Sequence, residues 1–261
     1  MSDRNGYAPG VPCWVDTWQP DADKAAGFYS ELLGWEAEGP SGGPYMCKLR
    51  GRDAAFIGQL PPQDAHRPSA WMTYVQVESA DATAERVRAA GGSVPVGPFD
   101  ALDGGRIAIV ADPAGAHLGV WQLGEHSGAE VVNEPAAWSW SQLLTTDPDA
   151  AKPFYAAVFG WETDSFGEMT MFRVPGFVGG EPSQPVSRDV VAGMAPLPNG
   201  DGFPHWRIDF WVDDVDATVA KAVELGGRAV VPPYDAGIAD QAVIADPAGA
   251  VFSVSRIKTG G

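Results

Sequence analysis

Two stretches of the sequence alternate aromatic and ionisable residues in a pattern that suits a binding or catalytic surface. Side chains two positions apart on a β-strand share one face, so Asp16 would lie between two indoles and Asp209 between an arginine and an indole. A carboxylate in apolar surroundings is expected to have a raised pKa, which suits a general base. Asp16 and Asp209, together with the nearby His205, are therefore the candidate catalytic residues. The two alternating sets are Trp14, Asp16 and Trp18, and Arg207, Asp209 and Trp211.

Further strand-like stretches add residues to the same kind of surface. A wall of flat rings with few polar groups suits a planar, largely apolar ligand, because a stacked aromatic pair contributes about 0.5–1.5 kcal/mol beyond simple burial. We therefore predict a site for an aromatic, polycyclic small molecule. The added candidate ligand-binding residues are Met72, Tyr74, His117, Trp121, Trp140 and Gln142.

Four polar residues near these positions offer an alternative chemistry. Asp16, His117, Gln142 and His205 carry donor types that Fe(II) or Zn(II) accept, provided that three or four of them converge on one point. The other interpretation is that they bind ligand or water in separate places. The chain has two cysteines, which are too few for a cysteine-rich metal site, and we expect both to be buried thiols.

The elements that must position these residues occur twice, because the chain repeats itself. The repeat predicts two homologous halves, residues 1–123 and 138–261, joined by a linker at 124–137. The aligned segments are Cys13–Glu38 with Ser139–Asp164, Val75–Ala101 with Phe210–Ala236, and the hexapeptide ADPAGA at Ala111–Ala116 and Ala245–Ala250.

Each half has the same predicted order of elements, namely strand, helix and strands, followed by strand, helix and a hairpin around Asp-Pro-Ala-Gly. This order is βαβββ written twice. The second half differs in the Pro- and Gly-rich segment Glu181–Pro204, which we interpret as a loop, either a lid or a solvated excursion. The predicted segments of the first half are 14–18, 21–33, 46–49, 54–60, 71–77, 80–90, 107–110 and 118–121.

Composition excludes several classes of function. The 261 residues include 17 Lys and Arg against 34 Asp and Glu, and the resulting charge of −17 repels nucleic acid and anionic membrane surfaces. No stretch of 18 apolar residues is present, and residues 1–10 lack the apolar region of a secretory signal. We therefore expect a cytoplasmic protein with neither a nucleic acid nor a membrane partner.

The repeated pattern resembles a known superfamily. An Asp-rich turn and a helix ending Phe-Tyr-x-x-x-x-Gly-Trp, followed by strand, helix, Gly-Gly and a strand-turn-strand with Asp-Pro-x-Gly, is similar to the vicinal oxygen chelate proteins. These include glyoxalases, extradiol dioxygenases and bleomycin-resistance proteins. The resemblance implies an α+β fold in which each half builds a curved mixed sheet, or cup, with its helices outside. It is strongest to tandem glyoxalase-like proteins of actinomycetes that are loosely called hydroxylases and are found beside antibiotic pathways.

The same resemblance implies where a metal would bind in this superfamily. Its ligands are His, Glu or Gln on the first strand of a module, on the strand before the second helix and late on the last strand. None of the residues at the corresponding positions supplies such a ligand, so we predict no metal and no cofactor. Those residues are Trp14, Met72 and Gly119 in the first half, and Trp140, Arg207 and Ser253 in the second.

The sequence thus favours a metal-independent protein that binds an aromatic small molecule in secondary metabolism, for sequestration, for resistance or in support of a tailoring oxygenation. The alternative is a glyoxalase-type lyase, dioxygenase or hydroxylase that uses an off-pattern metal site or a carboxylate base. A third class, a protein–protein module, would have cups filled by its own side chains. A homodimer and a partner oxygenase both remain open.

Overall fold

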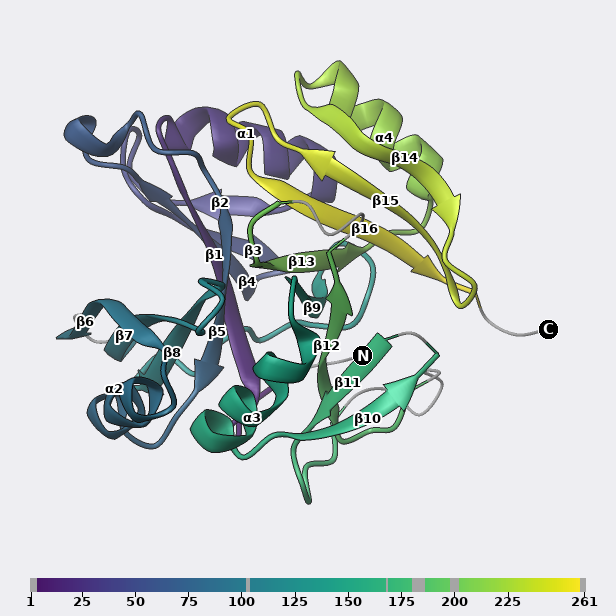
Figure 1. Cartoon of the computed structure of the whole chain (residues 1–261). Coiled ribbons are helices and arrows are strands. Elements are labelled where there is room, and N and C mark those ends of the chain that lie inside the picture. Colours follow the sequence, from purple (N-terminus) through teal and green to yellow (C-terminus); the bar gives the residue numbers. More distant parts are fainter. Residues whose placement is uncertain (1–3, 102–103, 168, 180–185, 198–201, 259–261) are drawn as a thin grey trace.

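Two eight-stranded mixed sheets and four α-helices make up the computed structural model, which describes residues 4–101, 104–167, 169–179, 186–197 and 202–258 (Figure 1). The strand order is β2-β3-β4-β1-β5-β8-β7-β6 in the first sheet and β10-β11-β12-β9-β13-β16-β15-β14 in the second. The second order equals the first with eight added to each number, so the halves share one topology. The predicted α+β fold of two halves, each βαβββ twice, is confirmed.

The first sheet is built from residues 12–123 and carries helices α1 (Ala22–Leu33) and α2 (Ala80–Ala89). A short 3-10 helix, η1 (Pro62–Asp64), precedes β5. The strands are β1 (Pro12–Gln19), β2 (Glu36–Glu38), β3 (Tyr45–Leu49), β4 (Arg52–Gln59), β5 (Trp71–Gln76), β6 (Ser93–Asp100), β7 (Gly105–Ala111) and β8 (His117–Leu123).

The second sheet is built from residues 138–257 and carries helices α3 (Pro148–Phe159) and α4 (Val215–Glu224). The strands are β9 (Trp138–Thr145), β10 (Glu162–Phe166), β11 (Met169–Arg173), β12 (Val190–Pro196), β13 (His205–Trp211), β14 (Arg228–Asp235), β15 (Ala239–Ala245) and β16 (Val251–Ile257).

Matching residues begin and end the first helix of each half. The Asp21 side chain accepts a hydrogen bond from the backbone N–H of Lys24, and Asp147 does the same for Ala150, so each aspartate caps a helix N-terminus. Gly34 and Gly160 end these helices with φ of 70° and 71°, a left-handed conformation that costs glycine little. The repeated Asp and Gly of the sequence therefore fix the length of both helices.

The two sheets meet through the faces that carry their helices. Figure 1 shows α1 beside α4 at the top and α2 beside α3 below, with the first sheet on the left and the second on the right, and each helix pair is in contact. At the centre, Thr73 Oγ1 on β5 lies 2.7 Å from Ser141 Oγ on β9. Strand alternation then turns the neighbouring side chains Tyr74 and Trp140 to the opposite faces. The two concave faces, here called the first cup and the second cup, consequently point away from each other.

A reciprocal pair of hydrogen bonds joins the halves. The Tyr29 hydroxyl on α1 donates to Asp246 Oδ2, in the Asp-Pro-Ala-Gly turn of the second half, at 2.9 Å. The Tyr155 hydroxyl on α3 donates to Asp112 Oδ2, in the matching turn of the first half, at 3.0 Å. Each carboxylate uses its other oxygen to accept two backbone N–H groups of its own turn. The Phe-Tyr pair of the helix and the Asp-Pro-Ala-Gly turn, both of which the sequence repeats, therefore join the two halves.

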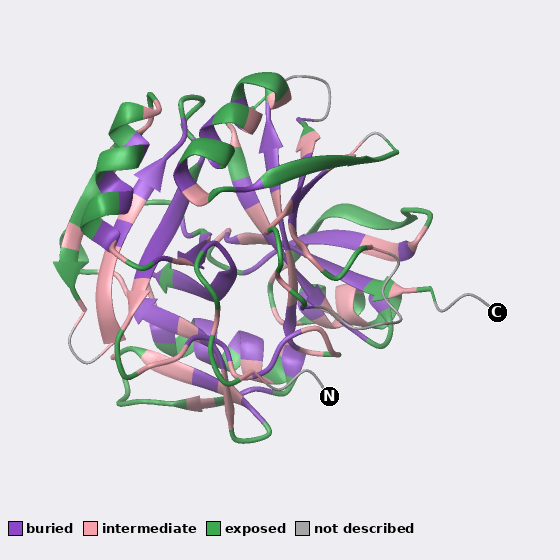
Figure 2. Cartoon of the chain, turned by 90° about the horizontal axis from the view of Figure 1, so that it is seen from below, coloured by how far each residue is buried: buried purple, intermediate pink, exposed green. Residues whose placement is uncertain are grey.

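Aromatic side chains complete this contact. Trp71 donates its indole N–H to the Tyr29 hydroxyl at 2.9 Å, and Trp206 donates to the Tyr155 hydroxyl at 3.0 Å. Trp35 and Trp161, which follow the two helices, are buried and bind the backbone carbonyls of Ala136 and Gly10 across the interface. Buried residues accordingly gather on the central strands and on the inner helix faces (Figure 2).

The structure corrects the expectation of a loop at Glu181–Pro204 and adds two edge strands to the predicted elements. The segment Glu181–Pro204 is not a loop throughout, because β12 (Val190–Pro196) lies within it and pairs in parallel with β9. Its Pro and Gly content hid a strand whose hydrogen-bond partners are distant in the sequence. Residues 181–185 and 198–201 lie outside the described residues, so the lid interpretation stays untested there. The edge strands β2 and β6 were not among the predicted segments.

The structure also bears on the two cysteines and on membrane-spanning segments. Cys13 and Cys47 are buried and unpaired, as predicted, and burial raises the pKa of the Cys47 thiol to about 12. Among the residues that the structure describes, no helix is both long and apolar enough to cross a membrane.

We expect the two interface tyrosines to differ in their contribution to stability. Asp246 Oδ2 also accepts from Gln19 Nε2 at 2.9 Å, whereas no second partner for Asp112 Oδ2 is found among the described residues. Tyr155→Phe should therefore lower the free energy of unfolding by about 1–3 kcal/mol, and Tyr29→Phe by less, because Tyr29→Phe leaves Asp246 Oδ2 with Gln19 as a donor. Equilibrium urea denaturation measures both. Equal losses would contradict this account of the interface.

Candidate ligand-binding site

The second cup contains a cavity of about 260 Å³. Its walls are formed by the central strands β9 and β13 and by β11, β15 and β16 together with the 234–238 segment. All five candidate ligand-binding residues of the second half line it. Those five are Trp140, Gln142, Arg207, Asp209 and Trp211. The pairing of β9 with β13 sets Trp140 opposite Asp209 and Gln142 opposite Arg207, so both strands contribute to one floor.

Asp209 anchors a hydrogen-bond network at this floor. It is 2% exposed, and it accepts hydrogen bonds from Ser255 Oγ, from Ser139 Oγ at 3.2 Å and from Gln241 Nε2 at 3.1 Å. Gln241 in turn accepts from the Tyr234 hydroxyl through its amide oxygen. Burial raises the pKa of Asp209, while its hydrogen bonds oppose that rise. With both oxygens engaged, Asp209 orients the wall and is poorly placed to act as a free base.

Arg207 is the other charged residue lining the cavity. Its Nε is buried without a hydrogen-bond partner among the described residues, and burial lowers the pKa of the guanidinium. The neighbouring Gln142 amide donates to the Met169 sulfur at 3.8 Å, which is a weak acceptor. Polar groups that can receive a ligand therefore sit side by side on β9 and β13.

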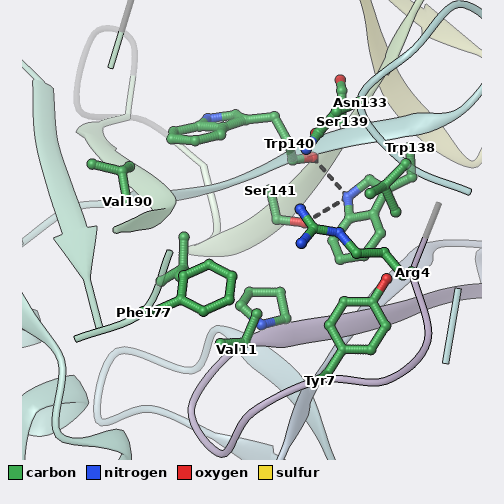
Figure 3. A pocket seen from close by; sticks show the side chains of 13 residues that line it. Arg4, Tyr7, Val11, Asn133, Trp138, Ser139, Trp140, Ser141, Phe177 and Val190 are labelled. Atoms are coloured by element: carbon green, nitrogen blue, oxygen red, sulfur yellow. Dashed lines mark hydrogen bonds between the residues drawn. The ribbon is translucent and has the colours of Figure 1, made fainter. Parts of the chain in front are cut away.

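A smaller cavity adjoins the second cup. It lies between the N-terminal segment, β9 and the residues Phe177, Val190 and Val191, and its volume is about 70 Å³. Figure 3 shows Tyr7, Val11 and Phe177 on one side of it and Trp140 on another, and Trp140 lines both cavities. An apolar cavity of about 150 Å³ holds one benzene ring, so this space is too small for a ring while the 260 Å³ cavity has room for more than one.

The first cup is covered by its own aromatic side chains. Trp14 is 5% exposed and makes edge contacts with Trp121 and with His126, a residue of the predicted linker, at centroid distances of 6.0 and 4.8 Å. His126 also stacks on Trp121, at 5.3 Å and an interplanar angle of 15°. The Tyr74 ring lies against Gly119, where an added Cβ would come within 2.1 Å of it. The rings of Trp14, Tyr74 and Trp121 are therefore in close contact with one another, with His126 or with Gly119.

Asp16 lies among these rings. It accepts hydrogen bonds through Oδ2 from the Tyr74 hydroxyl at 2.8 Å and from the Trp18 indole at 3.3 Å, while its Oδ1 has no partner among the described residues. Burial raises the pKa of Asp16 to about 7, and the two hydrogen bonds hold it below a still higher value. Of the three candidate bases, Asp16 therefore has both a free oxygen and a pKa near neutrality.

The difference between the cups follows from residues at equivalent positions. Tyr74 of the first half corresponds to Asp209 of the second, and Trp121 corresponds to Ser255. Two large rings are therefore replaced by two small polar side chains on the same strands, β5/β13 and β8/β16. The space that the rings fill in the first cup is part of the cavity in the second.

The four residues of the off-pattern metal site do not converge. Asp16 and His117 belong to the first sheet and Gln142 and His205 to the second, on cups that point apart. Both histidines are exposed at the beginnings of their strands, and His205 Nδ1 lies 2.8 Å from the carbonyl oxygen of Phe203. Within the described ranges, no group of three His, Cys, Asp or Glu side chains could hold a metal ion. The donor set of the second cup, one carboxylate beside a guanidinium, does not fit a divalent cation.

The structure places two further candidate ligand-binding residues in the first half, and their role in binding stays a prediction. Trp18 is 45% exposed at the rim of the first cup, and Met72 is partly buried beside its core. The sequence-based reasoning missed Tyr234, Gln241 and the methionines 169 and 171 of the second cup. Gln241 could have been found by alternation along β15, whereas Tyr234 and the methionines reach the site through sheet pairing that no local pattern reveals.

With this geometry established, comparison with known proteins identifies the family. The chain belongs to the glyoxalase/bleomycin resistance protein/dioxygenase superfamily, whose family model matches residues 14–120, and a model for a glyoxalase-like domain matches residues 142–255. A protein named putative glyoxylase CFP32 from Mycobacterium tuberculosis is 38% identical over 267 residues, covering 98% of both chains. The anthracycline biosynthesis protein DnrV of Streptomyces peucetius is 36% identical, covering 97% of this chain and 96% of its own.

Solved structures share the fold at low sequence identity. The Mn(II)-bound glyoxalase from Novosphingobium aromaticivorans has a TM-score of 0.64 at 17% identity, covering 95% of this chain and 82% of its own. The 2,3-dioxygenase LapB from Pseudomonas sp. KL28 has a TM-score of 0.63 at 13% identity, covering 98% and 96%. At these identities the likeness concerns the fold alone.

The buried carboxyl of Asp16 should make stability depend on pH. Its folded-state pKa of about 7 exceeds the ordinary value of 3.8, so the folded protein binds this proton more tightly than the unfolded chain does. The contribution is fully present below pH 4 and is lost as pH rises to 7, by about 1.4 kcal/mol per pH unit at most. Asp16→Asn should remove this fall, as measured by urea denaturation between pH 4 and 8.

Asp213→Asn, at an exposed position, is the matched control and should follow the wild-type pH profile. If Asp16→Asn also follows the wild-type profile, then Asp16 is ionised in the folded protein throughout this range.

Proposed function

We propose that this protein binds a planar aromatic small molecule in the second cup, without a metal. The observation that carries the proposal is the 260 Å³ cavity, which is lined by two indoles and the Tyr234 ring. Stacking on such rings contributes about 0.5–1.5 kcal/mol per pair beyond burial, and methionine side chains adapt to the edges of a flat ligand. The contrast with the ring-covered first cup supports assigning the site to the second.

The relatives agree with a ligand of this type. DnrV and DauV, from two Streptomyces sources, are each 36% identical to this chain and are named as anthracycline biosynthesis proteins. We infer that the ligand of this chain is a polycyclic aromatic metabolite, which the protein sequesters or presents to a tailoring enzyme such as an oxygenase. The absence of a converging donor set among the described residues supports metal independence.

One observation favours a second candidate function, an acid–base catalyst. Asp16 has a pKa near 7 and one oxygen without a partner, which are the properties of a general base at neutral pH. Its surroundings oppose the role, because the rings of the first cup leave the carboxyl 6% exposed. Catalysis there would require Trp18, the exposed ring of that cup, to admit the substrate.

A substitution at Trp140 tests the binding proposal. We expect 1,4-dihydroxyanthraquinone to quench tryptophan fluorescence with micromolar affinity, about −8 kcal/mol. Trp140→Ala should weaken binding by about 1–3 kcal/mol, because it removes one wall of the cavity. Trp14→Ala is the matched control at the equivalent position of the first half and should leave affinity unchanged. If Trp14→Ala weakens binding and Trp140→Ala does not, the ligand binds in the first cup.

Chelation tests the second part of the proposal. A metal bound to the native state raises its stability by mass action, so its removal lowers the melting temperature. We expect EDTA, and Mn²⁺ or Fe²⁺ added to the chelated protein, to leave both the melting temperature and the quenching titration unchanged. Stoichiometric metal by elemental analysis of the purified protein would overturn metal independence.

A further inference from the structure

We infer that the ligand of the second cup is an aromatic acid, held by an ion pair between its carboxylate and Arg207. This inference rests on the proposed function and specifies the substrate class. The guanidinium lines a cavity whose other charged residue is Asp209. Its Nε is buried, and no hydrogen-bond or ion-pair partner of Arg207 is found in the described part of the chain.

A half-buried guanidinium that lacks a hydrogen-bonded partner is costly. Removing a charged group from water without a compensating partner opposes folding, and the lowered pKa of Arg207 reflects that burial. The chain has twice as many acidic as basic residues, 34 against 17, so carboxylates to pair with an arginine are abundant. Asp209 lies two positions away on the same strand and attracts the guanidinium electrostatically, but it makes no hydrogen bond to Arg207, because its oxygens accept from Ser139, Ser255 and Gln241. A cation left unpaired here is explained by an anion that arrives with the ligand.

The surroundings select the type of anion. Met169, Met171, Ile238 and Ile257 form the apolar part of the lining, and the Asp209 carboxylate in the same cavity disfavours a second negative charge. One guanidinium therefore balances a monoanion better than a phosphate dianion. Arginine also binds a carboxylate through two parallel N–H groups in one plane, which would align the ligand with the floor of the cup.

The geometry places the remaining parts of the ligand. Gln142 lies opposite Arg207 in the β9–β13 pairing, and its amide N–H, now directed at the Met169 sulfur at 3.8 Å, can donate to the same carboxylate. Trp140 is two residues from Gln142, and Trp211 is four residues from Arg207, about 13 Å along the strand. A molecule of three fused rings with a carboxyl group approaches that length, with its acid at Arg207 and its rings along the two indoles.

A pair of probes that differ in charge alone tests this assignment. Anthraquinone-2-carboxylate and anthraquinone-2-carboxamide have the same shape, and each is titrated against the full-length protein by tryptophan quenching. We expect the acid to bind about 10- to 100-fold more tightly than the amide, in line with a charge-assisted hydrogen-bonded pair. Arg207→Met should abolish the preference by weakening the binding of the acid. Arg88→Met, at an exposed position on α2, is the matched control and should keep the preference.

The outcomes separate this inference from the binding proposal. If the acid and the amide bind equally well, and Arg207→Met changes neither, the aromatic site stands and the inference is overturned. If neither probe binds, the proposed function fails and the inference fails with it. A stability measurement gives an independent readout, because Arg207→Met removes a half-buried charge whose Nε has no hydrogen-bond partner among the described residues. It should raise the melting temperature of the ligand-free protein, and a lowered value would show that Arg207 has a structural role.

Discussion

The exchange of hydrogen bonds between the tyrosine of one half and the turn aspartate of the other determines the arrangement of the whole molecule. Tyr29 binds Asp246, and Tyr155 binds Asp112, so neither Asp-Pro-Ala-Gly turn is completed by its own half. Burying these carboxylates demands that they be hydrogen-bonded, which fixes the helix-bearing faces against each other. The concave faces are then left outside, where each could receive a ligand independently.

The two cups diverged within this shared frame. A common strand order allows residues to be compared position by position, and the comparison shows rings in the first half where the second has small polar groups. In the first cup, His126 from the predicted linker stacks on Trp121 and closes the surface. In the second, Ser255 and Asp209 leave a cavity and hold Gln241 and Tyr234 in place. One half of a duplicated protein therefore resembles a filled core, and the other resembles a binding site.

The two cups differ in their charged residues. Two carboxyls, Asp16 and Asp209, are buried on the concave faces with raised pKa values, but Asp209 is satisfied by three donors, whereas one oxygen of Asp16 is not. Arg207 is the cation of the second cup, in a protein of net charge −17. A long-range field that repels anions and a local cation that attracts one together favour a small, flat acid over a polyanion.

The sequence by itself determined the repeat, the α+β class, the helix limits and the five residues of the second half that share the cavity, because these depend on spacing and strand alternation. It did not determine which cup is open, since that depends on the Tyr74 ring meeting Gly119 and Trp121 across strands far apart in the chain. It also could not show that Tyr234 reaches Asp209 through Gln241, or that β12 pairs with β9. Those relations are set by long-range pairing, in which a residue's partner is decided by the fold and not by its neighbours.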